Sequence, residues 1–445
     1  MKFKVKKFLY YQKKIKNEII FQELKKIKDY KIFKKRKIKF KFSIKYITSH
    51  ELAFFFYSKI LIIINNIKNY KISKNLFKKF KGIKIMGYKV LDLFCGAGGL
   101  SLGFKMANYS IIGWIDIDQE ALDTHKLNFH DKFEYCGDVT TLDDEFIIKN
   151  FKDKVDVIIG GPPCQGFSVA NMQQKDLESD ERNKLFYQFI RFVKLSKPKA
   201  FVMENVPRIL TKNKGLVKKV MLSEMDKLGY NVNVKVLLAS DYGVPQKRKR
   251  AFFIGINKQL NKTFNFENIE KKPKTTVKDA ISDLYYMDNE IKSSTVDDKF
   301  KIKTEPESDY QSFMRKNSDD ILYNHNIKYP KEIVQKRMSY VPEGGNWKNV
   351  PDEMWDTIRN NRHSSAYRRL NSEEASITID TGHMNYFHPK YNRVPTVRES
   401  ARIQSFPDNF IFTGKQGSQF RQVGNAVPPL LSYAIAKTLK KYLNT

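Results

Sequence analysis

From Tyr88 onward the sequence predicts an α/β fold with a doubly wound sheet. Short apolar runs alternate with helical stretches, and the third run ends at Gly137 and Asp138. This is the pattern of strands joined by crossover helices. The chain has 445 residues, more than one domain usually holds, and its hydrophobic fraction of 41% suffices for a sizeable core. We therefore expect two or three compact units, one of them built on this sheet.

The first strand, turn and helix have the pattern of a nucleoside-binding unit. Lys89–Phe94 is a strand run, Gly96–Gly99 a tight turn and Leu100–Met106 a helix. Glycines let a ligand approach the backbone, and the helix N-terminus offers unpaired N–H groups. Asp116 and Asp118 follow the second run, where carboxylates can accept hydrogen bonds from ribose hydroxyls. The glycines alone would fit a structural turn equally well, but together with these acids they favour a nucleoside cofactor.

The fourth strand run leads to a candidate nucleophile. Val155–Gly160 is followed by Gly161-Pro162-Pro163-Cys164-Gln165-Gly166-Phe167-Ser168, at the edge where α/β sheets bind ligands. The prolines fix the loop and the glycines leave room for a flat substrate, so Cys164 suits covalent catalysis. We expect Cys95 and Cys136 to be buried structural residues. Three widely spaced cysteines exclude a disulfide framework and a paired zinc spacing, which favours a reducing intracellular compartment.

Two later segments bring charged residues to the same sheet edge. Glu204 follows the run Pro198–Met203, where it is either a structural cap or part of the site. In an extended segment before the next strand run, alternation places Gln246, Arg248 and Arg250 on one face and the intervening lysines on the other. A basic run is commonly a solvated face, but this position favours a contact to phosphate or substrate.

Between Gly255 and about Pro395 the looser pattern predicts a small, loop-rich domain. We expect Asp279–Leu284 to be helical and the polar stretch from there to Glu307 to be loop. Tyr340–Trp347 and Ser365–Leu370 mix glycine, aromatic and basic residues, as contacts to base edges and phosphates would. The alternative is that these aromatic residues form an ordinary core.

The formal net charge of +33 predicts nucleic acid as the partner, since such a surface attracts polyanions. Residues 1–85 contain 26 Lys or Arg against 4 Asp or Glu, in a composition dominated by Lys, Ile, Phe, Asn and Tyr. Their apolar stretch Leu52–Asn65 is shorter than the roughly 20 residues of a membrane span, and no secretory signal is found. We favour translation upstream of a true start at Met86 over the alternative, a basic arm that adds DNA affinity.

Six signatures, in this order along the chain, resemble those of bacterial DNA cytosine-5 methyltransferases of restriction-modification systems. They are Leu91-Asp92-Leu93-Phe94-Cys95-Gly96-Ala97-Gly98-Gly99, Pro162-Pro163-Cys164-Gln165, Glu204-Asn205-Val206, Gln246-x-Arg248-x-Arg250, Arg398–Pro407 and Gln422–Pro428. The resemblance runs from Lys89 to the C-terminus and leaves residues 1–85 unmatched. It implies a methyltransferase-type Rossmann fold, a doubly wound mixed sheet, with a smaller target-recognition domain.

The resemblance also implies how the chain is divided. Residues 1–85 are the basic extension, 86–255 the catalytic and cofactor-binding domain, 256–395 the target-recognition domain and 396–445 a C-terminal segment that returns to the catalytic domain. Arg398–Pro407 is then a helix that braces the recognition domain. Gln422–Pro429 returns to the cofactor, so the last helix packs onto the first domain.

The activity implied is methyl transfer from S-adenosyl-L-methionine to carbon-5 of cytosine in a specific double-stranded DNA sequence. Cys164 would add to carbon-6, and protonated Glu204 would hold ring nitrogen-3, a role that a raised pKa would serve. Arg250 would support the cytosine and the Cys164 thiolate, and Arg248 and Gln246 would shape the site. The target cytosine must leave the base stack for this chemistry.

The cofactor pocket that the resemblance implies draws on most of the signatures. Phe94, Gly96 and Gly98 would surround the methionine and adenine parts, Asp116 would bind the ribose, Ile117 would pack on adenine and Asp138 would bind its amino group. Pro162, Leu185, Asn425 and Ala426 would complete the pocket. Relatives often have the longer Glu at the ribose position, so Asp118 is expected to share the work of Asp116. No metal is expected.

The implied partner is double-stranded DNA. The resemblance implies a cytoplasmic monomer that is associated with the nucleoid and not with a membrane. A cognate restriction endonuclease would act separately, and the sequence leaves its existence open. A transfer RNA methyltransferase of the same family is disfavoured, because that branch usually carries Cys-Phe-Thr and a shorter variable region. A catalytically inactive DNA-binding regulator is disfavoured because every residue that the chemistry needs is present.

Overall fold

The computed structural model describes residues 87–129, 133–163, 184–290, 299–355, 367–382 and 385–444, which belong to one compact unit, Ile85–Thr445. Residues 1–85, and with them both explanations of that segment, lie outside the described residues, as does Cys164. In the part of the chain that is described, no helix has the length and apolar character needed to cross a membrane.

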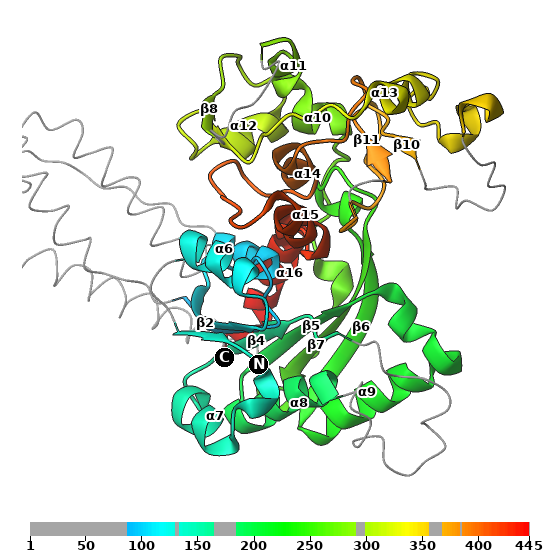
Figure 1. Cartoon of the computed structure of the whole chain (residues 1–445). Coiled ribbons are helices and arrows are strands. Elements are labelled where there is room, and N and C mark those ends of the chain that lie inside the picture. Colours follow the sequence, from blue (N-terminus) through cyan, green and yellow to red (C-terminus); the bar gives the residue numbers. More distant parts are fainter. Residues whose placement is uncertain are drawn as a thin grey trace, which may run out of the picture. The chain divides into compact units, whose positions relative to one another are not determined.

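A seven-stranded mixed sheet lies at the centre of this unit, in the order β3-β2-β1-β4-β5-β7-β6 (Figure 1). Neighbours among β1 to β5 are parallel, and β7 is antiparallel to both β5 and β6. The strands are β1 Lys89–Leu93, β2 Ser110–Asp116, β3 Phe133–Cys136, β4 Val157–Gly160, β5 Ala200–Asn205, β6 Tyr230–Leu238 and β7 Lys249–Asn257. The strand order reverses between β1 and β4, and the carboxyl edge at such a point is where ligand sites form.

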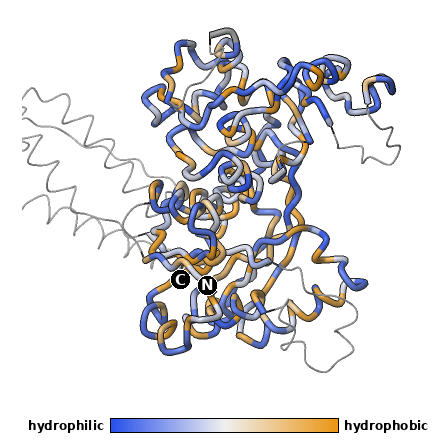
Figure 2. The backbone as a smooth tube through the Cα atoms, viewed as in Figure 1, coloured by the Kyte–Doolittle hydropathy of each residue, from blue (hydrophilic) through white to orange (hydrophobic). Residues whose placement is uncertain are grey.

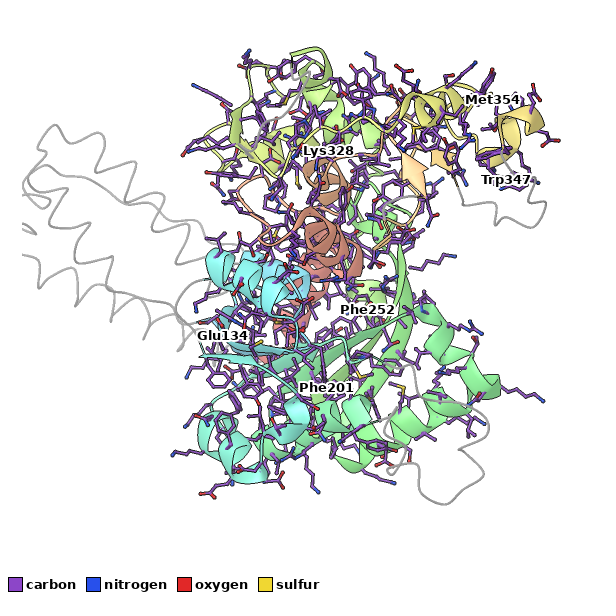
Figure 3. The ribbon with its side chains drawn as sticks, viewed as in Figure 1. Glu134, Phe201, Phe252, Lys328, Trp347 and Met354 are labelled. Carbon is purple, nitrogen blue, oxygen red and sulfur yellow. The ribbon has the colours of Figure 1, made fainter. Side chains whose placement is uncertain are left out.

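Helices cover both faces of the sheet, which confirms the doubly wound fold. One apolar core joins the strand residues Val90 and Phe252 to helices on one face, and a second joins Leu91 and Phe201 to helices on the other. Figure 3 labels Phe201 and Phe252 in the sheet, and Figure 2 shows the apolar strands between the layers. The first face carries α5 Gly99–Met106, α6 Gln119–Phe129 and α16 Pro429–Leu443; the second carries α7 Asp144–Phe151, α8 Lys184–Ser196 and α9 Leu216–Lys227.

The last helix, α16, packs against α5, the helix that follows the glycine-rich turn. The Ser432 hydroxyl in α16 donates to the carbonyl of Leu100 at 2.6 Å. A Cβ on Gly103 would lie 2.3 Å from the Cβ of Ser432, so only glycine allows α5 and α16 to approach this closely. The C-terminal segment therefore forms part of the fold that carries the glycine-rich turn.

The region beyond β7 consists of short elements. The predicted helix is confirmed as α10 Val277–Ile281 with a 3-10 turn at Ser282–Leu284. The predicted loop up to Glu307 is wrong in part, because it includes α11 and β8, and Met287 and Ile302 are buried in a small apolar cluster. The elements are α11 Met287–Glu290, α12 Asp309–Arg315, α13 Glu332–Ser339, α14 Val397–Ile403, α15 Gln416–Asn425, β8 Lys299–Lys301, β9 Ile321–Tyr323, β10 Arg368–Arg369 and β11 Tyr386–Phe387.

The apolar core continues across the predicted boundary at residue 255. Phe264, Ile281 and Ile379 belong to the same buried cluster as Val90 in the first strand. The apolar core is therefore continuous across residue 255. The division into a catalytic domain and a target-recognition domain at residues 255 and 395 stays a prediction about function.

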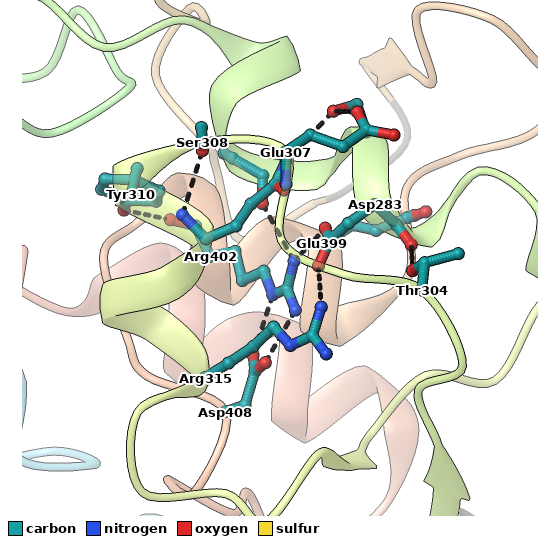
Figure 4. A network of polar contacts seen from close by, with 12 residues as sticks. Asp283, Thr304, Glu307, Ser308, Tyr310, Arg315, Glu399, Arg402 and Asp408 are labelled. Atoms are coloured by element: carbon teal, nitrogen blue, oxygen red, sulfur yellow. Dashed lines mark hydrogen bonds and ion pairs between the residues drawn. The ribbon is translucent and has the colours of Figure 1, made fainter.

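Helix α14 is anchored by ion pairs, which fits the bracing role predicted for it. Arg402 lies between Asp283 and Asp408, whose carboxylates it meets at 2.5 and 2.7 Å (Figure 4). All three side chains are fully buried. Because Asp283 follows α10, this arginine ties the helix to the start of the region predicted to recognise the target.

Candidate active site

The glycine-rich turn after β1 is held in place by Asp116, at the end of β2. Its Oδ2 accepts a hydrogen bond from the N–H of Gly96 at 2.7 Å, and its Oδ1 accepts from the N–H groups of Ile117 and Asp118 at 2.7 and 3.0 Å. Phe94 and Gly96 have φ angles of 58° and 50°. Asp116 thus stabilises a left-handed turn, a role that its position after the strand did not reveal.

The glycines predicted to border the cofactor lie in different surroundings. A Cβ on Gly96 would meet no atom within 4 Å, so this residue borders open space. A Cβ on Gly98 would lie 2.7 Å from both the His125 ring and the Phe129 ring of α6, and the Gly98 N–H donates to the carbonyl of Cys95. Gly96 is therefore the position that allows a ligand to approach, whereas Gly98 allows two helices to pack.

Beyond β2 and β3 the predicted adenine contacts lie at the surface. Ile117 is 72% exposed, so its apolar side chain is open to packing against a flat ring. Asp138 is exposed and its Oδ1 accepts from the N–H of Thr140 at 2.8 Å, which lowers the pKa of this carboxyl. The expectation that Cys136 is buried is wrong, since it ends the short strand β3 in an exposed position, while Cys95 is buried as predicted.

The C-terminal signature comes within contact distance of the same turn. Asn425 is exposed at the end of α15. The Cβ of Ala426 lies 3.1 Å from the point that a Cβ on Gly99 would occupy. Leu185, in the first turn of α8, is half-buried against the opposite core. The open space at Gly96, the exposed Ile117 and the available Asp138 and Asn425 fit a nucleoside-containing cofactor.

At the ends of β4 and β5, Glu204 lies next to Gly161, the first residue of the segment that leads to Cys164. A Cβ on Gly161 would be 2.9 Å from Glu204 Oε2, so the absence of a side chain lets the carboxyl approach this residue. Pro162 is buried and its carbonyl accepts a hydrogen bond from the Asn205 side chain at 3.0 Å. The strand ends thus bring the predicted acid beside the segment that leads to the predicted nucleophile.

Glu204 forms an ion pair with Arg250. The distance from Arg250 Nε to Glu204 Oε1 is 2.8 Å, and the two side chains are about equally shielded, 15% and 14% exposed. Burial raises the pKa of Glu204, although Arg250 and Arg248 oppose this shift. A carboxyl whose pKa is raised holds a proton more readily, which is the property that a hydrogen bond to a ring nitrogen requires.

Gln246 and Arg248 are fully buried. Their side chains form hydrogen bonds within the protein and do not face solvent. The Arg248 guanidinium donates to the carbonyls of Ile379 and Gly424 at 3.0 and 2.7 Å, and burial lowers its pKa to about 9. Gln246 accepts from the Ile379 N–H at 3.1 Å and donates to Gln404. The predicted alternation is confirmed, because Lys247 and Lys249 are exposed. Both buried residues bind the Ile379 backbone, and the site-shaping role predicted for them stays a prediction.

The sequence did not single out Gln404 as part of this site. Its side chain donates to the carbonyls of Val423 and Ala426 at 3.2 and 2.6 Å, so it joins Gln246 to the C-terminal signature. Its place inside the signature Arg398–Pro407 was the available signal, but that segment predicted only a helix.

The segments predicted to contact DNA contain both core and surface residues. Arg369 is buried and donates to the carbonyls of Met338, Val341 and His388, so it organises the region instead of facing solvent. Tyr340 is 42% exposed. Ser365 and Ala366 lie outside the described residues.

Comparisons with known proteins show the family of this chain. A family model described as C-5 cytosine-specific DNA methylase matches residues 88–441. The chain is 36% identical over 393 residues to the type II methyltransferase M1.HphI of Haemophilus parahaemolyticus, covering 87% of this chain and 97% of that protein. It is 39% identical over 382 residues to M.DdeI of Desulfomicrobium norvegicum, covering 79% and 88%.

Solved structures give the same match. A proposed DNA modification methyltransferase encoded within an E. coli prophage is 30% identical, with a TM-score of 0.64 over 81% of this chain and 100% of that one. The methyltransferase EhMeth of Entamoeba histolytica is 15% identical with a TM-score of 0.52 over 80% and 98%, a likeness of fold alone.

Proposed function

The chain belongs to the C-5 cytosine-specific DNA methylase family, and we propose that Cys164, Glu204 and Arg250 carry out its reaction. It is a DNA (cytosine-5)-methyltransferase, whose substrate is DNA and whose family uses S-adenosyl-L-methionine. The observation that carries the proposal is the shielded Glu204–Arg250 pair beside Gly161, three residues before Cys164.

The chemistry assigned to these residues follows from the cytosine ring. Carbon-5 is a poor nucleophile until the Cys164 thiolate adds to carbon-6 and Glu204 holds a proton on ring nitrogen-3. Bound S-adenosyl-L-methionine supplies an electrophilic methyl group. Once carbon-5 carries the methyl group, its proton passes to a base such as solvent water, and the electron pair of that C–H bond reforms the aromatic ring as the Cys164 thiolate is expelled. Arg250 favours the thiolate by its positive charge and orients the Glu204 carboxyl.

The described residues offer a consistent place for the cofactor. Gly96 leaves room for the cofactor to approach, Ile117 offers an apolar surface to the adenine ring, and the side chains of Asp138 and Asn425 are exposed. Asp116 keeps its carboxylate among three backbone N–H groups, so its contact to a ribose hydroxyl would use the remaining lone pairs. The pocket would be closed by Phe94, Pro162, Leu185 and Ala426. Gly98 would contribute indirectly, because it allows α6 to pack against the glycine-rich turn.

We further propose that residues 256–395 select a specific double-stranded sequence while the target cytosine rotates out of the helix. Most named relatives are type II methyltransferases, which supports protection of host DNA in a restriction-modification system. The enzyme would act as a cytoplasmic monomer bound to the nucleoid, with any restriction endonuclease acting separately.

The test combines bisulfite sequencing with a covalent trap. DNA from cells expressing the chain should carry methylcytosine at one sequence, and duplex containing 5-fluorocytosine should form a denaturation-resistant adduct, because elimination is blocked. Cys164→Ala should form no adduct while binding S-adenosyl-L-methionine normally; Cys136→Ala is the matched control at an exposed cysteine. An adduct that persists in Cys164→Ala would exclude the assigned nucleophile.

A further inference from the structure

We infer that Asn205 is a positioning residue that sets the distance between the nucleophile loop and Glu204. This inference rests on the proposed function of Cys164 and Glu204 and assigns a further residue to it. The side-chain amide of Asn205 donates to the Pro162 carbonyl at 3.0 Å, and its Oδ1 accepts from the Val206 N–H at 3.0 Å. One buried side chain thus connects the two segments that carry the reacting groups.

The position of this contact follows from where the sheet ends. The parallel pairing of β4 with β5 stops at Gly160 and Met203. Pro162 and Pro163 have no N–H to donate to β5, so the backbone ladder ends before them. Two residues beyond the last pair, the Asn205 side-chain amide donates to the Pro162 carbonyl, a bond from β5 to the segment that follows β4. The loop is therefore attached to β5 by a side chain at the point where the strands can no longer hold it.

The spacing along the chain gives this attachment its effect. Glu204 directly precedes Asn205, and Cys164 follows Pro162 by two residues. Gly161 leaves only enough room for the Glu204 carboxyl, since a Cβ there would lie 2.9 Å from Oε2. Asn205 holds the Pro162 carbonyl against β5. Gly161 sets how closely the Glu204 carboxyl can approach the backbone of this segment. Thiolate addition at carbon-6 and the hydrogen bond at nitrogen-3 act on one flat ring, so their separation must match that ring.

The amide of Asn205 is the required chemical group, because the position must donate on one side and accept on the other. Asn205→Asp keeps the shape, but an ionised carboxylate only accepts and would repel the Pro162 carbonyl. A protonated carboxyl can donate to Pro162 and accept from Val206, as the amide does. The defect of Asn205→Asp should therefore be relieved as the pH falls and the introduced carboxyl becomes protonated.

Asn233 provides the matched control. Its amide donates to the Phe264 carbonyl at 2.7 Å from β6, which lies at the far edge of the sheet. Asn233→Asp also removes an asparagine-to-carbonyl bond from the same sheet, but it leaves the β4 and β5 ends untouched. A general loss of stability would affect both variants, whereas a positioning defect affects only Asn205→Asp.

The experiment measures adduct formation with 5-fluorocytosine duplex in a single turnover, together with binding of S-adenosylhomocysteine, over a range of pH. Asn205→Asp should slow adduct formation by about 100-fold at neutral pH, as a misplacement near 1 Å does, with cofactor binding unchanged. The rate relative to the wild type should recover as the pH falls, and Asn233→Asp should match the wild type throughout.

Asn205→Ser guards against a variant that fails to fold, because its shorter hydroxyl cannot span both segments; it should show the same loss with no recovery at low pH. Equal rates for Asn205→Ser and Asn233→Asp would overturn the inference, as would a loss in Asn205→Asp that does not change with pH. Absence of an adduct with the wild-type protein would instead contradict the proposed function itself.

Discussion

Glu204 at the sheet edge and Glu399 in α14 are each paired with an arginine, but their surroundings differ. Glu399 is fully buried and accepts two bonds from Arg393, both at 2.8 Å, and a third from the Thr396 N–H at 2.6 Å. Burial alone would raise its pKa, but Arg393 lowers it well below its ordinary value. Glu204 has one contact of 2.8 Å to Arg250, and burial raises its pKa.

The difference shows that an arginine partner does not by itself decide the role of a buried acid. Charge-assisted hydrogen bonds favour the ionised carboxylate, while desolvation favours the protonated form. Glu399 has enough such bonds to remain charged, and Arg402 in Figure 4 belongs to the same kind of structural arrangement. Among the residues that the structure describes, Glu204 has fewer such bonds, so burial prevails and its carboxyl can hold a proton.

The largest expected effect separates the two acids by activity. Glu204→Gln should lower turnover by about 10²- to 10⁴-fold, the usual contribution of a positioned acid. The thermal midpoint should fall less than in Glu399→Gln, because the loss of the Arg250 partner is offset by the removal of a carboxyl whose charged form burial disfavours. Turnover and the thermal midpoint are measured on the same preparation. A large loss of both in Glu204→Gln would contradict the distinction between a catalytic Glu204 and a structural Glu399.

Glu399→Gln should have the opposite result. Removing one partner of a buried ion pair leaves Arg393 uncompensated and should cost about 3–5 kcal/mol of unfolding free energy. Turnover per folded molecule should be close to that of the wild type at low temperature. Urea unfolding measures the first quantity and an assay below the midpoint the second; full stability in this variant would show that the network is dispensable.

The pH dependence of stability should have opposite signs at the two acids. Glu399, with its lowered pKa, contributes stability that is present above its unfolded value near 4.5 and is lost as the pH falls. Glu204, with its raised pKa, contributes stability that is present below 4.5 and is lost as the pH rises through its folded value. Melting curves across pH should therefore show the Glu399→Gln defect shrinking in acid and the Glu204→Gln variant gaining on the wild type in base.

The smallest effect is expected at an exposed pair. Lys247 and Glu374 form an ion pair with both side chains about half exposed. Glu374→Gln should change the unfolding free energy by no more than about 1 kcal/mol, because solvent screens such pairs. Urea unfolding is again the measurement, and a loss as large as that of Glu399→Gln would mean that burial is not the deciding variable.

The sequence alone was sufficient for the local features of this protein. Strand runs ending in glycine or acid predicted β1 to β5, because period and turn chemistry act over a few residues. The alternation of Gln246, Arg248 and Arg250 with the lysines was also predicted, since side chains alternate along any extended segment. The ordered signatures identified the family, because each of them is also a run of only a few residues that can be recognised in the sequence.

Only the tertiary structure decided which residue contacts which. Asp116 holds the glycine turn, Gln404 joins two signatures and Asn205 links the Pro162 carbonyl to β5, and each contact joins segments distant in the chain. Glu204 and Glu399 are the same residue type, each in a recognisable motif, but the number of donors around each carboxyl depends on how strands and helices pack. No local pattern contains that number, and it sets the pKa that separates an acid able to hold a proton from one that only holds the fold together.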